Sequence, residues 1–198
     1  MDGKKLTFIL AIILATIIVG QARAQQATVS VVPASYTVSA VGTSFTVNVT
    51  VQNVEDLYGW ALKIYYPNDV LNGTNVTEGS FLKTGGFSTV FIDVNFTDDY
   101  NATDGVVNVL CTRTGNVLGE NGTGTLATIT FKSVSTGGPQ TLHLADIELS
   151  DSNLGAIPFS QVDGKVTVLP ELSTVLILPL LVASATVALV LRKKIKQP

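Results

Sequence analysis

Residues 44–66 read SFTVNVTVQNVEDLYGWALKIYY and contain the two clearest strand patterns in the chain. Apolar residues occupy alternate positions from 45 to 51, with threonine and asparagine between them. The alternation returns at residues 60–66, after a polar corner at residues 53–56. A period of two is typical of a β-strand with one buried and one solvated face. We therefore expect both runs to be strands that contribute to one hydrophobic core.

Shorter alternating runs recur through the rest of the middle of the chain, separated by Gly, Asn, Asp and Pro. No run has helical periodicity. Eight to ten strands without crossover helices predict an all-β, antiparallel β-sandwich or jelly roll. Besides the two runs above, the predicted strands are 27–32, 36–39, 80–82, 88–96, 106–112, 125–133, 141–144, 147–149 and 165–169.

The N-terminal end is typical of a secretory signal peptide. Lys4 and Lys5 precede an apolar run at residues 6–19, and Ala22-Arg23-Ala24 supplies small residues for cleavage before Gln25. An uncleaved N-terminal anchor is the alternative.

The C-terminal end predicts one transmembrane helix. Residues from Leu172 to Leu191 carry no charge, and twenty helical residues reach roughly 30 Å, enough to cross a bilayer core. Arg192, Lys193 and Lys194 follow at once, which predicts a cytoplasmic C-terminus and an extracellular ectodomain on a single-pass cell-membrane protein. The predicted organisation is a signal peptide at 1–24, a β-sandwich ectodomain at 25–169, and the helix with its basic tail at 170–198.

The predicted ectodomain is acidic and cannot form an intrachain disulfide. It holds five basic and thirteen acidic side chains, a net charge of −8, which argues against nucleic-acid binding. Cys111 is the only cysteine and alternates with valines, so we expect it to be a buried apolar residue.

The sequence offers little for catalysis. His143 is the only histidine, alternates with leucines and is expected to point outward, and no metalloprotease, phosphate-loop or paired-cysteine motif is present. Asp98, Asp99 and Asp104 cluster in one loop and could bind Ca²⁺, the only cofactor considered; a solvated turn is the alternative. We predict a protein that is not an enzyme.

Six Asn-X-Thr sequons occur, which is more than we expect by chance. An asparagine in such a sequon accepts a glycan when it is exposed in an exported protein. The alternative is that Asn and Thr simply populate turns and exposed strand faces. The predicted glycosylation sites are Asn48, Asn72, Asn75, Asn95, Asn101 and Asn121.

From about residue 27 to residue 169 the chain resembles a cohesin module. The ordered segments that carry the resemblance include Asn-Val-Glu-Asp-Leu-Tyr-Gly-Trp at 53–60, Ile-Tyr-Tyr-Pro-Asn-Asp-Val-Leu at 64–71, Gly-Thr-Gly-Thr-Leu-Ala-Thr-Ile-Thr-Phe at 122–131 and Asp-Gly-Lys-Val-Thr-Val at 163–168. The resemblance implies a nine-stranded jelly roll, related to carbohydrate-binding modules, that holds a dockerin-like protein on one sheet face. On that face it implies Lys63, Tyr65, Asp93, Asn95, Asn108 and Arg113, although a register shift of one residue would exchange the whole set.

The tail Pro170-Glu171-Leu172 resembles the sorting tails of archaeal surface proteins, which a membrane transpeptidase recognises. The leading hypothesis is a membrane-anchored binding module for a dockerin-like protein, linked to polysaccharide breakdown. The alternatives are a carbohydrate-binding module that binds polysaccharide through exposed aromatics, or a structural subunit of a surface coat or filament. The nearest aromatics for a sugar site are Tyr58, Trp60, Tyr65 and Tyr66, of which Trp60 is expected in the core.

Overall fold

The computed structural model describes residues 26–171, which form a β-sandwich. The predicted signal peptide and the predicted transmembrane helix lie outside the described residues. Within residues 26–171, no helix is long and apolar enough to cross a bilayer. The elements are β1 (Ala27–Val32), β2 (Ser35–Val38), β3 (Ser44–Leu57), β4 (Gly59–Pro67), β5 (Leu71–Glu78), the 3-10 helix η1 (Phe81–Gly86), β6 (Thr89–Thr97), β7 (Asp104–Arg113), β8 (Glu120–Ser133), β9 (Gly137–Ser150), β10 (Phe159–Val162) and β11 (Gly164–Val168).

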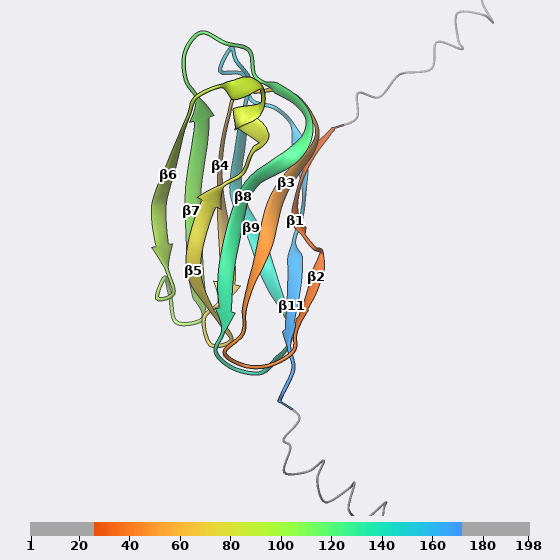
Figure 1. Ribbon diagram of the computed structural model, residues 1–198, viewed down its shortest axis with the longest axis vertical. Coiled ribbons are helices and arrows are strands. Elements are labelled where there is room, and N and C mark those ends of the chain that lie inside the picture. Colours follow the sequence, from red (N-terminus) through yellow and green to blue (C-terminus); the bar gives the residue numbers. More distant parts are fainter. Residues whose placement is uncertain (1–25, 172–198) are drawn as a thin grey trace, which may run out of the picture.

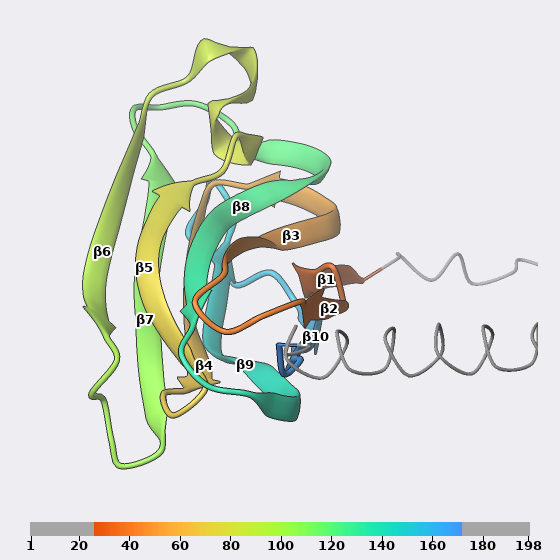
Figure 2. The ribbon, with the colours of Figure 1, turned by 60° about the horizontal axis from the view of Figure 1, so that its bottom comes forward.

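The strands form two sheets that pack face to face (Figure 1). The five-stranded sheet has the order β10-β1-β3-β8-β5, and the six-stranded sheet has the order β2-β11-β9-β4-β7-β6. Figure 2 shows the two layers, with the edge strands β5 and β6 close together on one side. The expectation of a wholly antiparallel sandwich is wrong, because β10 runs parallel to β1 and β11 runs parallel to β2.

The two runs that decide the fold lie in opposite sheets. β3 is in the five-stranded sheet and β4 is in the six-stranded sheet, and both bury their alternate apolar residues in the same core. Phe45 and Trp60 are each 4% exposed, as expected for one shared core. The polar corner between the runs belongs to β3, where Asn53 and Asp56 have φ of 54°. Asparagine and aspartate tolerate this left-handed backbone better than other non-glycine residues.

Three further expectations about the strands are corrected by the structure. The described residues hold eleven strands and not the nine that the resemblance implies. Two of them, β5 and β10, were not predicted because their sequences lack a clear alternation. Residues 80–82, predicted as a strand, lead into η1, which buries Phe81 and Leu82. The runs 141–144 and 147–149 form one strand, β9, which is interrupted by a bulge at Asp146 where φ is 46°.

Candidate partner-binding face

The outer face of β9, β4, β7 and β6 presents the side chains that do not enter the core. On β4, Leu62 and Ile64 are buried, whereas Lys63 and Tyr65 between them are half-exposed. The strand register places Lys63 opposite Asn108 on β7, and Asn108 opposite Asn95 on β6. The structure therefore brings these four predicted residues together on one outer face. We call the outer surface of these four strands the β4–β7 face.

Apolar side chains cross this face, a feature that the sequence reasoning missed. Ala61 of β4 lies opposite Leu110 of β7, and Leu110 lies opposite Ile92 of β6, which is 46% exposed. Ala61 and Leu110 also line a shallow depression of about 560 Å³, together with Leu154 of the loop after β9. Alternation with Asn108 was the signal that could have identified Leu110, because residues two apart on a strand share a face.

Charged groups flank the apolar row. The Lys63 ammonium donates a hydrogen bond to the Asp146 carboxylate at 2.7 Å. This hydrogen bond and the negative charge of Asp146 raise the pKa of Lys63 above its ordinary value, so Lys63 is a cation at neutral pH. Asp146 is available on this side because the β9 bulge at its position breaks the alternation.

Two tyrosines lie at the end of the β4–β7 face near the β6–β7 turn. The rings of Tyr65 and Tyr100 are tilted at 49° with centroids 5.4 Å apart, and the proximity of Tyr100 raises the pKa of Tyr65. Beside them His143, which is exposed as expected, contacts the Asp163 carboxylate through Nδ1 at 2.7 Å. A depression of about 410 Å³ is lined by Tyr65, Tyr100, Asn101, Asp104, Thr141 and His143.

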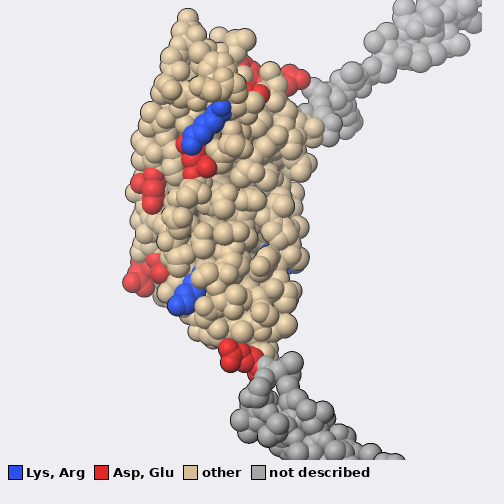
Figure 3. Space-filling view, viewed as in Figure 1, with Lys and Arg blue, Asp and Glu red and all other residues tan. Residues whose placement is uncertain are grey.

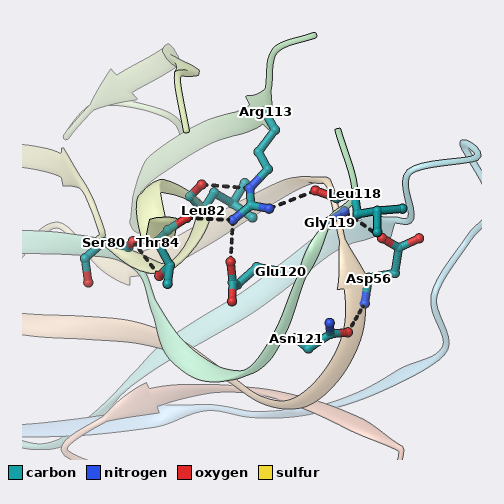
Figure 4. A network of polar contacts seen from close by, with 9 residues as sticks. All are labelled: Asp56, Ser80, Leu82, Thr84, Arg113, Leu118, Gly119, Glu120 and Asn121. Atoms are coloured by element: carbon teal, nitrogen blue, oxygen red, sulfur yellow. Dashed lines mark hydrogen bonds and ion pairs between the residues drawn. The ribbon is translucent and has the colours of Figure 1, made fainter. Parts of the chain in front are cut away.

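Arg113 was predicted on this face, and that placement is wrong. The residue is 2% exposed, since β7 turns Cys111 and Arg113 to the same inner side. Its guanidinium donates to the carbonyl oxygens of Leu82, Thr84 and Leu118, at 2.8, 3.2 and 2.8 Å (Figure 4). It also pairs with the Glu120 carboxylate and lies 4.5 Å from the centre of the Phe87 ring. Arg113 thus ties η1 to the start of β8, a structural role.

Asp93 lies on the outer edge of the sandwich. It is exposed on β6 at a register shift between Asp93 and Asn95, where it lies opposite the buried Val109 of β7. A bulge of this kind turns the edge strand and disrupts the simple alternation of faces. Its register position is the one that carries Val109, so the structure does not group Asp93 with Lys63 and Asn108 on the β4–β7 face.

A comparison with models of known protein families gives one match. A family model described as the cohesin domain matches residues 29–168. The chain belongs to the cohesin family. A search of curated proteins found no match for this cohesin chain.

Solved cohesin domains share the fold at low sequence identity. The non-cellulosomal cohesin of the archaeon Archaeoglobus fulgidus has a TM-score of 0.55 and 19% identity, over 73% of this chain and 91% of that chain. A cohesin from a type I cohesin–dockerin complex of Clostridium thermocellum has a TM-score of 0.60 and 14% identity, over 73% of this chain and 99% of that chain. A type II cohesin domain from the cellulosome of Acetivibrio cellulolyticus has a TM-score of 0.57 and 17% identity, over 71% of this chain and 95% of that chain.

The three aspartates considered for Ca²⁺ have separate roles in this cohesin domain. Asp98 Oδ1 accepts hydrogen bonds from the Tyr66 hydroxyl and the Gly73 amide, and Asp104 accepts from Asn101 and Thr103. Among residues 26–171, no group of three or more His, Cys, Asp or Glu side chains is arranged to hold a metal ion. The structure therefore does not assemble Asp98, Asp99 and Asp104 into a cation site.

The outer face of the opposite sheet has a different character. Its side chains are mostly threonine and asparagine, from β3, β8 and β5. Figure 3, viewed onto this side, shows only a few scattered charged side chains. Asn48, Asn72 and Asn75 of the predicted sequons lie here, while Asn95, Asn101 and Asn121 lie on β6, in the turn after it and at the start of β8.

Proposed function

We propose that this cohesin domain is a non-catalytic binding module whose β4–β7 face holds a dockerin-like protein. The observation that carries the proposal is the row of Ala61, Leu110 and Ile92, which is set among Lys63, Asn108 and other polar groups. An apolar centre with a polar rim is the usual anatomy of a protein interface. Several solved cohesins of the same fold were crystallised as complexes with dockerins, which supports this class of partner.

The opposite outer face fits a partner less well. Its exposed positions on β3 and β8 include Thr46 and Lys132, and Thr128 and Thr130 are half-exposed. Interfaces gain most of their free energy from buried aromatic, aliphatic and arginine side chains, which these positions do not provide. The difference between the two faces gives the binding experiment an internal control.

We further propose that the domain is displayed outside the cell, anchored by the predicted helix at 172–191. The signal-peptide pattern at 1–24 and the basic residues after the helix support this arrangement. A link to polysaccharide breakdown is part of the same proposal, supported by the cellulosomal origin of some similar cohesins. The surface position of His143 and the burial of Cys111 support a role in binding rather than catalysis.

The test of partner binding uses residues 26–171, which contain the whole described core, as bait in Ca²⁺ and again in EGTA. Captured proteins from the source organism are identified by mass spectrometry, made recombinantly and titrated by calorimetry. Leu110→Glu should weaken binding about 10- to 100-fold, since it places a charge at the interface centre. The matched control is Thr130→Glu, which adds the same half-exposed charge to the opposite sheet. Equal binding by both variants would refute the proposal that the β4–β7 face binds the partner.

A second candidate function rests on the Tyr65–Tyr100 pair. Tilted exposed tyrosines beside Asn101, Asp104 and His143 combine an apolar surface for a sugar ring with hydrogen-bonding groups. In this alternative the domain binds polysaccharide. Retention on insoluble polysaccharide, lost in Tyr100→Ala and kept in Leu110→Glu, would favour it over a protein partner; self-assembly alone would favour the structural-subunit alternative.

A further inference from the structure

The sandwich has two long unpaired edges on the same side. Within residues 26–171, β5 pairs only with β8, and β6 only with β7, so each has one side without a neighbouring strand. They have 8 and 9 residues, whereas the edge strands β2 and β10 on the other side have 4 each. An open edge is a template for pairing with another chain, and the risk grows with its length. β6 adds exposed Val90, Ile92 and Val94, at 43, 46 and 51%.

Each long edge carries a sequon asparagine directly after a bulge. On β5 the register shifts between Gly73 and Asn75, and on β6 it shifts between Asp93 and Asn95. Both asparagines are exposed, and within residues 26–171 neither side chain makes a hydrogen bond. A bulge protects an edge by turning its backbone away from a straight pairing partner.

Three other sequon asparagines have hydrogen-bonded side chains. Asn48 accepts from the Thr128 hydroxyl at 2.8 Å, and Asn121 accepts from the Asp56 amide at 2.8 Å. Asn101 accepts from the amides of Thr103 and Asp104 and donates to Asp104. Asn72 is half-buried on β5. The combination of an exposed side chain and no side-chain hydrogen bond within residues 26–171 thus distinguishes Asn75 and Asn95 from the other four.

We propose that Asn75 and Asn95 carry N-linked glycans that cap the two long edges and prevent strand pairing with a second copy of the chain. Asparagine Nδ2 forms a bond to the anomeric carbon of a lipid-phosphate-linked sugar. The bond from that carbon to the phosphate oxygen breaks, the lipid phosphate leaves with the electron pair, and the amide nitrogen loses one proton to the solvent. The proposal requires export of the domain but does not depend on dockerin binding. A glycan at Asn95 would stand at the β6 border of the β4–β7 face.

The first experiment measures sugar occupancy at each sequon of the full-length chain, purified from a host that exports and N-glycosylates proteins. Glycopeptide mass spectrometry should find Asn75 and Asn95 occupied at least about tenfold more than Asn48 and Asn121. Bare asparagines at both edge sites, or equal occupancy at Asn48, would overturn the proposal. This result is independent of partner capture.

The second experiment measures association of the full-length chain in detergent by sedimentation velocity. Asn75→Gln with Asn95→Gln should form dimers or larger species at concentrations where the glycosylated parent is a monomer. Asn48→Gln, the same change on a central strand, should remain a monomer, and Ile92→Lys added to the double variant should restore the monomer. A double variant that stays monomeric, or association in Asn48→Gln, would refute the edge-capping role.

Discussion

The hydroxyl of Tyr66 donates a hydrogen bond to the Asp98 carboxylate at 2.6 Å and thereby ties β4 to the turn after β6. Tyr66 is fully buried, and the same carboxylate oxygen accepts from the Gly73 amide of β5 at 2.7 Å. Burial and the hydrogen bond to Asp98 together raise the pKa of Tyr66 well above its ordinary value, so the hydroxyl stays protonated. One polar contact thus connects strands from both sheets.

Removal of this hydroxyl tests its contribution to stability. Tyr66→Phe should lower the free energy of unfolding by about 1–2 kcal/mol, because Asp98 loses a donor in a partly buried site. Guanidinium denaturation measures the change. Tyr36→Phe is the control, since the Tyr36 ring stacks on Phe45 and its hydroxyl makes no hydrogen bond within residues 26–171. Equal changes in unfolding free energy in the two variants would contradict a stabilising role for the hydrogen bond between Tyr66 and Asp98.

Arg113 should matter for stability and not for partner binding. Arg113→Met should cost about 3–5 kcal/mol, because it leaves the carbonyl groups of η1 and the Glu120 carboxylate without their buried donor. Faster hydrogen exchange at residues 81–86, measured by mass spectrometry, should accompany the loss. Lys165→Met, at an exposed site, should change the stability little. Weakened partner binding in a fully folded Arg113→Met protein would show that Arg113 contributes to the interface after all.

Asp56 should make the stability of the domain depend on acid pH. A hydrogen bond from the Ser152 hydroxyl, at 2.6 Å, and bonds from the backbone amides of Gly119 and Ser152 outweigh burial and lower the pKa of Asp56 from its ordinary value. Since the folded pKa is the lower one, this stabilisation is present above the unfolded pKa and is lost as the pH falls through the folded pKa.

Asp56→Asn tests this dependence without changing the backbone preference, because asparagine also tolerates the φ of 54°. The difference in unfolding free energy between the parent and Asp56→Asn should be largest near neutral pH and shrink below about pH 4. Denaturation at a series of pH values measures it. A constant difference down to pH 2 would exclude a role for the charge.

Cys111 should be inert in the folded protein, as expected for the buried residue found here. Burial, together with the hydrogen bond to Glu78, raises the pKa of the Cys111 thiol to about 12. At pH 8 roughly one thiol in ten thousand is then ionised, so thiol reagents should label it only after unfolding. The exposed control Ser135→Cys should label at once. Rapid labelling of native Cys111 would show that β7 opens.

The period-two pattern was a reliable guide wherever a strand has one solvated and one buried face. On β4 it placed Lys63 and Tyr65 outside and Trp60, Leu62 and Ile64 in the core, all as observed. It was less useful for β5, where asparagine, glycine and threonine give no apolar alternation, and for the four-residue β10. Edge strands bury little, so their sequences carry a weak pattern.

Arg113 and the polar corner show what periodicity cannot predict. The alternation on β7 places Arg113 with Cys111, but the resemblance implied an outer position for Arg113, whereas carbonyl groups of η1 provide buried acceptors. These acceptors come from about 30 residues earlier in the chain. The apolar row of Ala61, Leu110 and Ile92 also joins three strands, and only the register brings it together.

The parallel pairing of β1 with β10 and of β2 with β11 has a consequence for synthesis of the protein. Among residues 26–171, β2 has β11 as its only neighbouring strand, and β1 lies between β3 and β10, so both complete their pairing only when the last strands have left the ribosome. Closing such long loops costs entropy before any contact offsets it, so the sandwich should fold slowly, and its folding should be completed only after β11 has left the ribosome. In chains truncated before Gly164, β2 should have no strand to pair with and Val38 should be exposed to solvent. Such chains should be degraded by proteases faster than the full-length chain.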